Sequence, residues 1–449
     1  MNTLHVGAAR LEITPPVGVP TGGGGPDGYQ ATTSVLDPLY VRALRLRSAG
    51  SEILLFQADL LGLSRTKAES IARAVSQRTG IPGSSILIAC PQTHNAGCTF
   101  TGNYPDQTPG QFVNAGHRQW YETLEDRFSD AAGAARAREQ PVVAGIARGT
   151  CGGVCANRRA CRKDGSIAMA WYDPRPADVA SWGPDDPEVL LVGFRAAADA
   201  QPVAMLWHFT GHPNSIWMLP CFSRDYPGVV EDAFAAVVPG ITSFFLNGFC
   251  GNIDAYRCMG IAKEVFTHPF YQEPGRDLTV NITAMRRSGQ RLATRVSELW
   301  QKIAWGREDW TKLEMRRRRL TCAVRDGGLE YRAHYEPCVE LAGIRIGPVG
   351  LACAPFEPVV ELGLWLKQHS PARFTIPVGH CPYYTGYLPN QAILKEGGFE
   401  AQTHWSGYAD GTGEAVADGL LLLLRELFPS TGTVTGSDSS RAPASPACS

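Results

Sequence analysis

The chain has 449 residues, of which 44% are hydrophobic and 19% are charged. This balance is typical of a globular protein and excludes a chain that is mostly disordered. The 42 Lys and Arg residues are offset by 43 Asp and Glu residues, so the net charge is only -1. Because no strong overall field would attract nucleic acid or an anionic membrane, we expect neither as a partner, and we expect a small-molecule substrate.

Cysteine, glycine and proline stand out in the composition. The 48 Gly and 32 Pro residues indicate many turns and loops, where functional residues concentrate. The 13 cysteines are odd in number, so at least one thiol has no partner within the chain. The first residues lack the basic and apolar regions of a signal peptide, and the longest apolar run, Leu420–Leu424, is too short to span a membrane. We therefore expect a cytoplasmic protein with reduced thiols.

In chain order, the first 35 residues are rich in Pro and Gly, and we expect an irregular loop there. Ile53–Leu61 is an apolar run of strand length, and Ser85–Cys90 is the next one. Between them, Thr66–Arg78 has apolar residues at helical spacing, with Thr66 and Glu69 at the spacing of a capping box. This order predicts a βαβ unit.

Later segments continue the alternation of strands and helices. Strands are predicted at Val203–Phe209, Ser243–Leu246, Val349–Cys353 and Phe374–Val378, and helices at Trp120–Arg138, Gly289–Ile303, Glu357–His369 and Gly413–Phe428. The class is therefore α/β or mixed α+β, with a large mixed β-sheet core flanked by helices. We expect residues 1–428 to form a single domain, and residues 429–449, which are poor in large apolar groups, to form a disordered tail.

Polar residues follow five of the apolar runs, at the points where ligand groups gather in open α/β sheets. They are Gln92, His94, His212, Asn247, Asn252, Asp254, Glu357, His380, Tyr383, Tyr384 and Tyr387. Imidazole and carboxylate are usual ligands of a catalytic zinc, and Asp254 is a candidate base or nucleophile. Loop hydrogen bonding for each His, helix capping for Glu357 and simple packing for the tyrosines are the competing interpretations.

Nine segments, in this order, resemble the neutral ceramidase family, specifically its catalytic N-terminal domain and its shorter bacterial relatives. They are Gly7–Pro16, Leu36–Leu44, Thr93–Asn95, Asn157–Arg159, Gly211–Ser215, Ser223–Gly228, Phe245–Asp254, Pro355–Pro358, and Tyr384–Tyr387 with Glu396–Glu400.

The resemblance implies a zinc amidohydrolase in which two His, a Glu and a Tyr hold one Zn²⁺. Carried over, the metal ligands are His212, Glu357 and Tyr387. The first zinc His of the family falls on Gln92, which is a departure. His94 matches a second His that lies beside the metal and contacts substrate. We therefore expect His94 to complete the metal site, with Gln92 as a weak oxygen ligand or loss of the metal as the alternatives.

The resemblance also implies catalytic and substrate-binding residues. The family's catalytic serine falls on Asp254, two residues after Asn252. Asp254 would orient or activate water, because a carboxylate could not reproduce the role of a serine hydroxyl. From the chemistry of the guanidinium group, Arg158 or Arg159 could bind a substrate carboxylate in bidentate fashion, and surface charge is the competing interpretation. Gln92 and Tyr384 are further candidates for binding substrate. The family's membrane-binding C-terminal β domain has no counterpart here, and we therefore do not expect ceramide as the substrate.

The cysteines near these loops leave a separate question. Cys90, Cys98 and Cys250 lie in or beside the segments that would build the site. Most free cysteines are small buried apolar residues. A thiol that replaces the lost His as a ligand, or the lost Ser as a nucleophile, is the alternative, with Cys98 and Cys250 as first candidates.

The leading hypothesis is a metal-dependent hydrolase of an amide bond in a small acylated or cyclic substrate. A second hypothesis is a tailoring enzyme of specialised metabolism that forms or rearranges an amide or ring. A third is a non-catalytic relative that binds a ligand.

Overall fold

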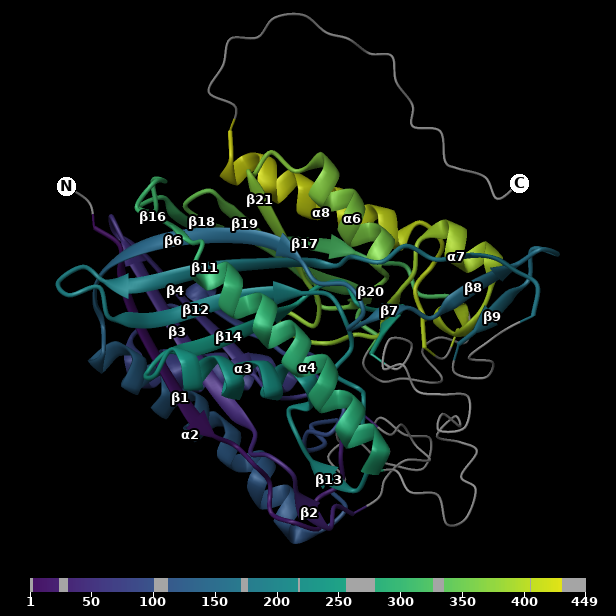
Figure 1. Ribbon diagram of the computed structural model, residues 1–449, viewed down its shortest axis with the longest axis horizontal. Coiled ribbons are helices and arrows are strands. Elements are labelled where there is room, and N and C mark those ends of the chain that lie inside the picture. Colours follow the sequence, from purple (N-terminus) through teal and green to yellow (C-terminus); the bar gives the residue numbers. More distant parts are fainter. Residues whose placement is uncertain are drawn as a thin grey trace, which may run out of the picture.

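The computed structural model describes residues 3–23, 31–100, 112–170, 177–216, 219–255, 279–325, 335–403 and 405–429, and every structural statement below concerns these residues. Two β-sheets pack face to face, and helices cover the outer face of each (Figure 1). The apolar core between the sheets contains alternate side chains of both, such as Val192 and Leu206 from one sheet and Ile344 and Leu351 from the other. This α/β class with a large mixed sheet confirms the predicted fold.

The larger sheet has the strand order β14-β12-β11-β6-β1-β3-β4-β5, and β16 pairs with β6. Its strands are β1 (His5–Glu12), β3 (Tyr40–Ser48), β4 (Ser51–Ala58), β5 (Ile86–Ala89), β6 (Gln140–Thr150), β11 (Glu188–Ala196), β12 (Pro202–Phe209), β14 (Thr242–Asn247) and β16 (Ala304–Trp305). The smaller sheet has the order β17-β18-β19-β21, with β17 (Leu313–Thr321), β18 (Cys338–Ile346), β19 (Val349–Cys353) and β21 (Phe374–Val378).

Three helix pairs cover the outer faces of the sheets. Helices α1 (Arg65–Thr79) and α2 (Ala115–Ala137) pack on the β1-β3-β4-β5 half of the larger sheet. Helices α3 (Asp225–Val237) and α4 (Thr279–Trp300) cover its β11-β12-β14 half. Helices α6 (Val360–His369) and α8 (Thr412–Leu427) cover the smaller sheet, and α7 (Gln391–Glu396) lies beyond them (Figure 1). None of the described helices is long and apolar enough to cross a bilayer.

Short strand pairs join the loops at one end of the sheets. They are β2 (Ser34–Val35) with β13 (Cys221–Phe222), β7 (Ala156–Asn157) with β15 (Ile253–Asp254), and β20 (Glu357–Pro358) with β22 (Tyr387–Leu388). A three-stranded sheet of β8 (Arg159–Arg162), β9 (Ile167–Met169) and β10 (Val179–Trp182) extends from this end (Figure 1).

The predicted βαβ unit is confirmed, because β4 and β5 are parallel neighbours joined through α1. The predicted capping box was wrong: Ser64 is the N-cap, and its hydroxyl accepts a hydrogen bond from the Lys67 backbone at 3.2 Å. Glu69 instead pairs with Arg65. The helix ends at Gly80, which has φ 76°.

The first 35 residues were expected to form an irregular loop, and this expectation was wrong for the residues that begin the segment. Residues His5–Glu12 form β1, which pairs with β3 along its full length and with β6 at its start. The small residues Gly7, Ala8 and Ala9 give little strand signal, yet a side chain at Gly7 would lie 2.0 Å from the Ala135 carbonyl oxygen of α2. Close packing between β1 and α2 therefore explains the composition of this strand.

The helix predicted at Glu357–His369 begins three residues later, at Val360. Glu357 is extended because it precedes Pro358, which disfavours helical backbone, and it pairs with Tyr387 between β20 and β22. The 11 described cysteines form no disulfide, and all but Cys161 and Cys338 are buried. Of the predicted tail, residues 430–449 lie outside the described residues.

Candidate active site

The loops that follow β5, β12, β14, β19 and β21 meet at the carboxyl ends of these strands and are joined by backbone hydrogen bonds. These bonds run from His94 N to Pro213 O (3.2 Å), His212 N to Ile253 O (3.0 Å), Gly251 N to Pro358 O (2.8 Å), Glu357 N to Gly386 O (2.9 Å) and His380 N to Phe356 O (2.8 Å). Because each loop bonds to another, residues that are far apart in the sequence are held in one cluster.

Gly251 lets two of these loops approach closely. A Cβ atom at this position would lie 2.7 Å from the Glu357 carbonyl oxygen and 2.9 Å from that of Pro358. Side chains do not tolerate such contacts, so glycine is required where the loop after β14 crosses β20.

Glu357 is the centre of the cluster and is fully buried. Its Oε1 lies 2.6 Å from His212 Nε2, and its Oε2 accepts a hydrogen bond from the Tyr384 hydroxyl at 3.0 Å. Burial would raise the pKa of Glu357, but His212 and His380 hold it well below its usual value. Glu357 is therefore an ionised carboxylate.

His212 has a fixed orientation. Its Nδ1 lies 2.8 Å from the Ile253 carbonyl oxygen, which can only accept, so Nδ1 donates and Nε2 faces Glu357. Burial would lower the pKa of His212, but the Cys250 thiol and the Glu357 carboxylate raise it well above its ordinary value. An imidazole oriented in this way by a backbone carbonyl is what a metal-binding His requires.

Asp254 lies on the other side of His212, with Oδ1 3.6 Å from His212 Nδ1. The same oxygen accepts hydrogen bonds from Asn214 Nδ2 at 2.9 Å and from Arg158 Nη1 at 3.2 Å. The Asp254 carboxylate is thus buried and held by two donors.

Arg158 and Arg159 bond to carboxylates of the protein itself. Arg158 is buried and donates to Glu400 (2.7 Å) and to the Tyr387 hydroxyl (3.4 Å) as well as to Asp254. Arg159 donates to the other oxygen of Glu400 at 2.6 Å and to Glu396 at 3.0 Å. Both arginines therefore bond to carboxylates of the protein itself, and their predicted binding of a substrate carboxylate stays a prediction.

His94 and Gln92 lie beside His212. The ring centroids of His94 and His212 are 5.7 Å apart, and His94 Nδ1 lies 3.2 Å from the Gly23 carbonyl oxygen. Burial and the neighbouring His212 lower the pKa of His94 to about 3. Gln92 has a positive φ of 64°, and its Oε1 is 3.9 Å from Cys250 Sγ.

Asn252 and Cys98 make contacts outside this cluster. The Asn252 side chain donates through Nδ2 to Glu361 at 2.9 Å, and its Oδ1 accepts from the Val360 backbone N–H at 2.9 Å, so it holds the start of α6. The Cys98 thiol donates to the Phe100 carbonyl oxygen. Of the cysteines that the sequence singled out, Cys250 is therefore the one that contacts His212.

His380 follows the strand at Phe374–Val378, and its sequence position alone predicted no role for it. His380 is fully buried, and its ring stacks on Tyr384 with centroids 5.1 Å apart. Its Nε2 lies 3.7 Å from Glu357 Oε2, beyond hydrogen-bond length. One feature of the sequence could have pointed to His380. It follows β21, and β21 is parallel to β19, the strand that leads to Glu357.

Three residues of this cluster carry donor types that bind zinc in proteins. An imidazole, a carboxylate and a phenol from His212, Glu357 and Tyr387 are the kinds of donor that hold a catalytic zinc, which keeps one position open. Within the described ranges, no group of three or more His, Cys, Asp or Glu side chains is arranged to hold a metal ion. The set of His212, Glu357 and Tyr387 is not such a group, because only two of its three side chains are His or Glu.

Solved structures show the same fold. The chain superposes on the neutral ceramidase from Pseudomonas aeruginosa with a TM-score of 0.73 and 15% sequence identity, covering 98% of this chain and 77% of that one. A second structure, a ceramidase complexed with C2, gives the same TM-score and identity and is covered to 78%. The chain has a neutral-ceramidase fold. A scan of protein-family models finds no match, and a search of curated proteins finds none either.

Proposed function

We propose that the protein hydrolyses an amide bond in a small acylated or cyclic substrate and that His212, Glu357 and Tyr387 hold a zinc ion for this reaction. The observation that carries the proposal is the 2.6 Å contact between His212 Nε2 and Glu357 Oε1, buried where the strand ends of a neutral-ceramidase fold converge. When bound, zinc supplies Lewis acidity toward a carbonyl oxygen.

The residues around this pair have separate tasks. Asp254 is the base that accepts a proton from the attacking water, because it is a carboxylate within the cluster and is fixed by Asn214 and Arg158. The Tyr387 hydroxyl faces Glu357 and Arg158 and donates to the oxyanion that develops on the substrate. Burial raises the pKa of Tyr387 well above its usual value.

Arg158 connects these groups. It bonds to Asp254 and Tyr387 and stacks over the rings of Tyr387 and Phe399, with its guanidinium carbon 5.6 and 5.2 Å from the two centroids. Glu400 bonds to both Arg158 and Arg159. A buried chain of alternating charges therefore positions the base and the oxyanion donor relative to each other.

The test is amine release from a panel of small N-acyl amines and lactams, with ceramide included as one member. We expect turnover of at least one non-ceramide amide by zinc-loaded protein, and loss of that turnover in His212→Ala. If no member of the panel is hydrolysed by protein that contains zinc, hydrolysis is not the function, and analysis of products from amine and acid precursors then tests the tailoring reaction.

A further inference from the structure

A groove with a volume of about 510 Å³ lies beside α1, apart from the candidate active site. It is lined by residues of α1, β5, β17 and β18, and by Pro382 and Tyr383. Tyr384, the next residue, donates to Glu357, but none of the side chains that bond to Glu357 in the described part of the chain lines the groove. Sites for small-molecule ligands have volumes of about 300–1,000 Å³, so the groove is large enough to hold one.

Part of the lining is apolar. It consists of Ala68, Ala72, Ile86, Ile88, Pro382 and Tyr383. The Tyr383 ring is held from two sides, because the Arg65 guanidinium carbon lies 5.8 Å from its centroid and its hydroxyl accepts a hydrogen bond from the Glu340 backbone at 2.9 Å. These residues give the groove a preformed surface against which the apolar part of a ligand can pack.

The charged part of the lining has an excess of arginine. Four arginines and two glutamates line the groove, namely Arg65, Arg73, Arg317 and Arg319 with Glu69 and Glu340. The whole chain has a net charge of only -1, so this excess of positive charge is local. A guanidinium binds a carboxylate through two parallel N–H donors, which suits arginine to the recognition of carboxylate ligands.

Two of the four arginines are already paired. Arg65 Nε donates to Glu69 at 2.9 Å. Arg317 donates to Glu340 and, at 3.1 Å, to the Ser84 carbonyl oxygen. Both glutamates of the lining are therefore bonded to these two arginines, which are held in place by groups of the protein itself.

Arg73 and Arg319 are left for a ligand. The Arg73 side chain is 64% exposed, and its Nη1 lies 3.9 Å from the Glu69 carboxylate, beyond hydrogen-bond length. Arg319 is exposed and has no hydrogen bond or ion pair among the residues that the structure describes. Because Arg73 belongs to α1 and Arg319 to β17, the groove offers an anion one guanidinium group from each of two elements.

We propose that the groove binds a small amphipathic carboxylate, with its charged end at Arg73 and Arg319 and its apolar body against the lining around Tyr383. This inference does not depend on the proposed amide hydrolysis, because the groove and the cluster around Glu357 share no residue. A carboxylate with an apolar body uses both parts of the lining. A bare anion would leave the apolar part uncovered, and a neutral amphiphile would leave the two arginines without a partner.

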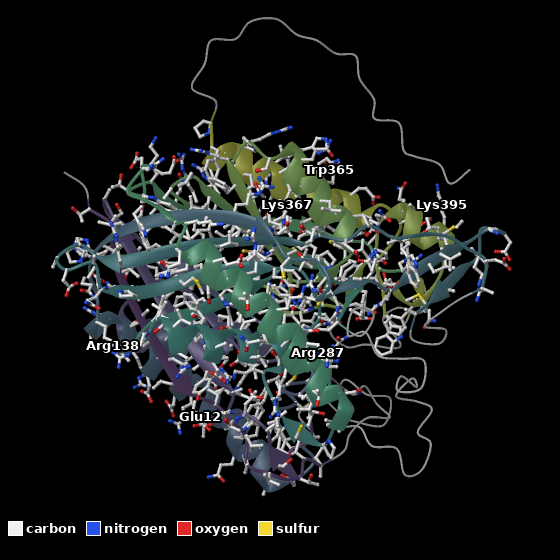
Figure 2. The ribbon with its side chains drawn as sticks, viewed as in Figure 1. Glu12, Arg138, Arg287, Trp365, Lys367 and Lys395 are labelled. Carbon is white, nitrogen blue, oxygen red and sulfur yellow. The ribbon has the colours of Figure 1, made fainter. Side chains whose placement is uncertain are left out.

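The experiment is isothermal titration calorimetry with octanoate as the probe. The proteins are the full chain, Arg73→Gln/Arg319→Gln and the matched control Arg138→Gln/Arg307→Gln, which removes two arginines outside the groove (Arg138 is labelled in Figure 2). All four positions are exposed, so both double variants should fold. We expect octanoate to bind the full chain and the control with equal affinity, and to bind the groove variant at least about tenfold more weakly. Equal affinity for all three proteins would overturn the assignment of the groove.

Three further probes test the class of ligand. Octanamide has the apolar body without the charge, acetate has the charge with almost no apolar body, and inorganic phosphate is an anion of another class. We expect each of them to bind the full chain at least about tenfold more weakly than octanoate does. Octanamide that binds as tightly as octanoate would show that the arginines do not recognise the ligand, and phosphate that binds as tightly would assign the groove to another class of anion. Either result, or no binding of octanoate to the full chain, would overturn the proposal.

Discussion

Asp254 and Arg158, 96 residues apart in the sequence, form a fully buried ion pair with 3.2 Å between Oδ1 and Nη1. The pair joins β15 to the segment between β7 and β8, and Glu400 completes it from the other side of the guanidinium. This buried ion pair holds the Asp254 carboxylate in place beside His212.

Replacing Asp254 by Asn keeps the size of the side chain and removes its basicity. We expect kcat for the best amide substrate to fall by about 10²–10⁴-fold, as for other general bases, with little change in KM. Asp232→Asn, on the surface of α3, is the matched control and should keep full activity. Turnover that is unaffected in Asp254→Asn would remove Asp254 from the mechanism.

The Arg158–Glu400 pair should be strongly coupled in stability. Removing one partner of a buried pair leaves an uncompensated charge and costs about 3–5 kcal/mol of unfolding free energy. We expect Arg158→Met and Glu400→Gln each to show a loss of this order in urea denaturation. The double variant should lose clearly less than the sum of the two, and additive losses would show that the two side chains do not interact.

Much of the site was predictable from the sequence because it follows strand ends. His212, Glu357, Asp254 and Tyr387 each lie in a loop after an apolar run, and parallel strands bring such loops to the same edge. The ordering of segments that resembles neutral ceramidases predicted the fold, which the structural comparison confirms.

Other features depend on contacts between distant residues that periodicity does not contain. The pairing of β1 depends on small residues packed against α2, so its sequence has little strand signal. Two of the carboxylates that bond to Arg158 and Arg159, Glu400 and Glu396, lie more than 200 residues away in the sequence. The missing hydrogen bonds of His380 can be recognised only once its burial is known.

The close backbone approach at Gly251 gives a matched pair of substitutions. Gly251→Ala places a Cβ 2.7 Å from the Glu357 carbonyl oxygen, so the backbone must shift. We expect a loss of about 1–3 kcal/mol in unfolding free energy, as for other overpacked sites, together with reduced turnover. Gly152→Ala has nothing within 4 Å of the added Cβ and should leave both quantities unchanged. Equal behaviour of the two variants would contradict the assigned role of Gly251.

A second buried cluster predicts how stability depends on pH. Lys367, labelled on α6 in Figure 2, donates to Asp186 at 2.7 Å and lies 3.1 Å from His208 Nε2. Burial, with Lys367 nearby, lowers the pKa of His208 to about 4 from 6.5. Because the unfolded chain takes up this proton first, the contribution of His208 is present above pH 6.5 and is lost as the pH falls toward 4.

Urea denaturation between pH 4 and 8 measures this contribution. The unmodified protein should lose about 3 kcal/mol more than His208→Gln between pH 6.5 and 4, since one pKa unit corresponds to about 1.4 kcal/mol. Titrating groups that do not interact with His208 act equally in both proteins and cancel in the difference. A difference that does not change with pH would show that His208 is not held neutral in the folded state.

The most direct test of the central claim, that Glu357 is the centre of an amide-hydrolysing site, is the rate of amine release by Glu357→Gln. The control is Glu336→Gln, which breaks a partly exposed pair with Arg65. If the account is right, Glu357→Gln loses at least 10²-fold in kcat/KM on an amide that the unmodified protein cleaves, and Glu336→Gln keeps its rate. Hydrolysis by folded Glu357→Gln at the unmodified rate would contradict it.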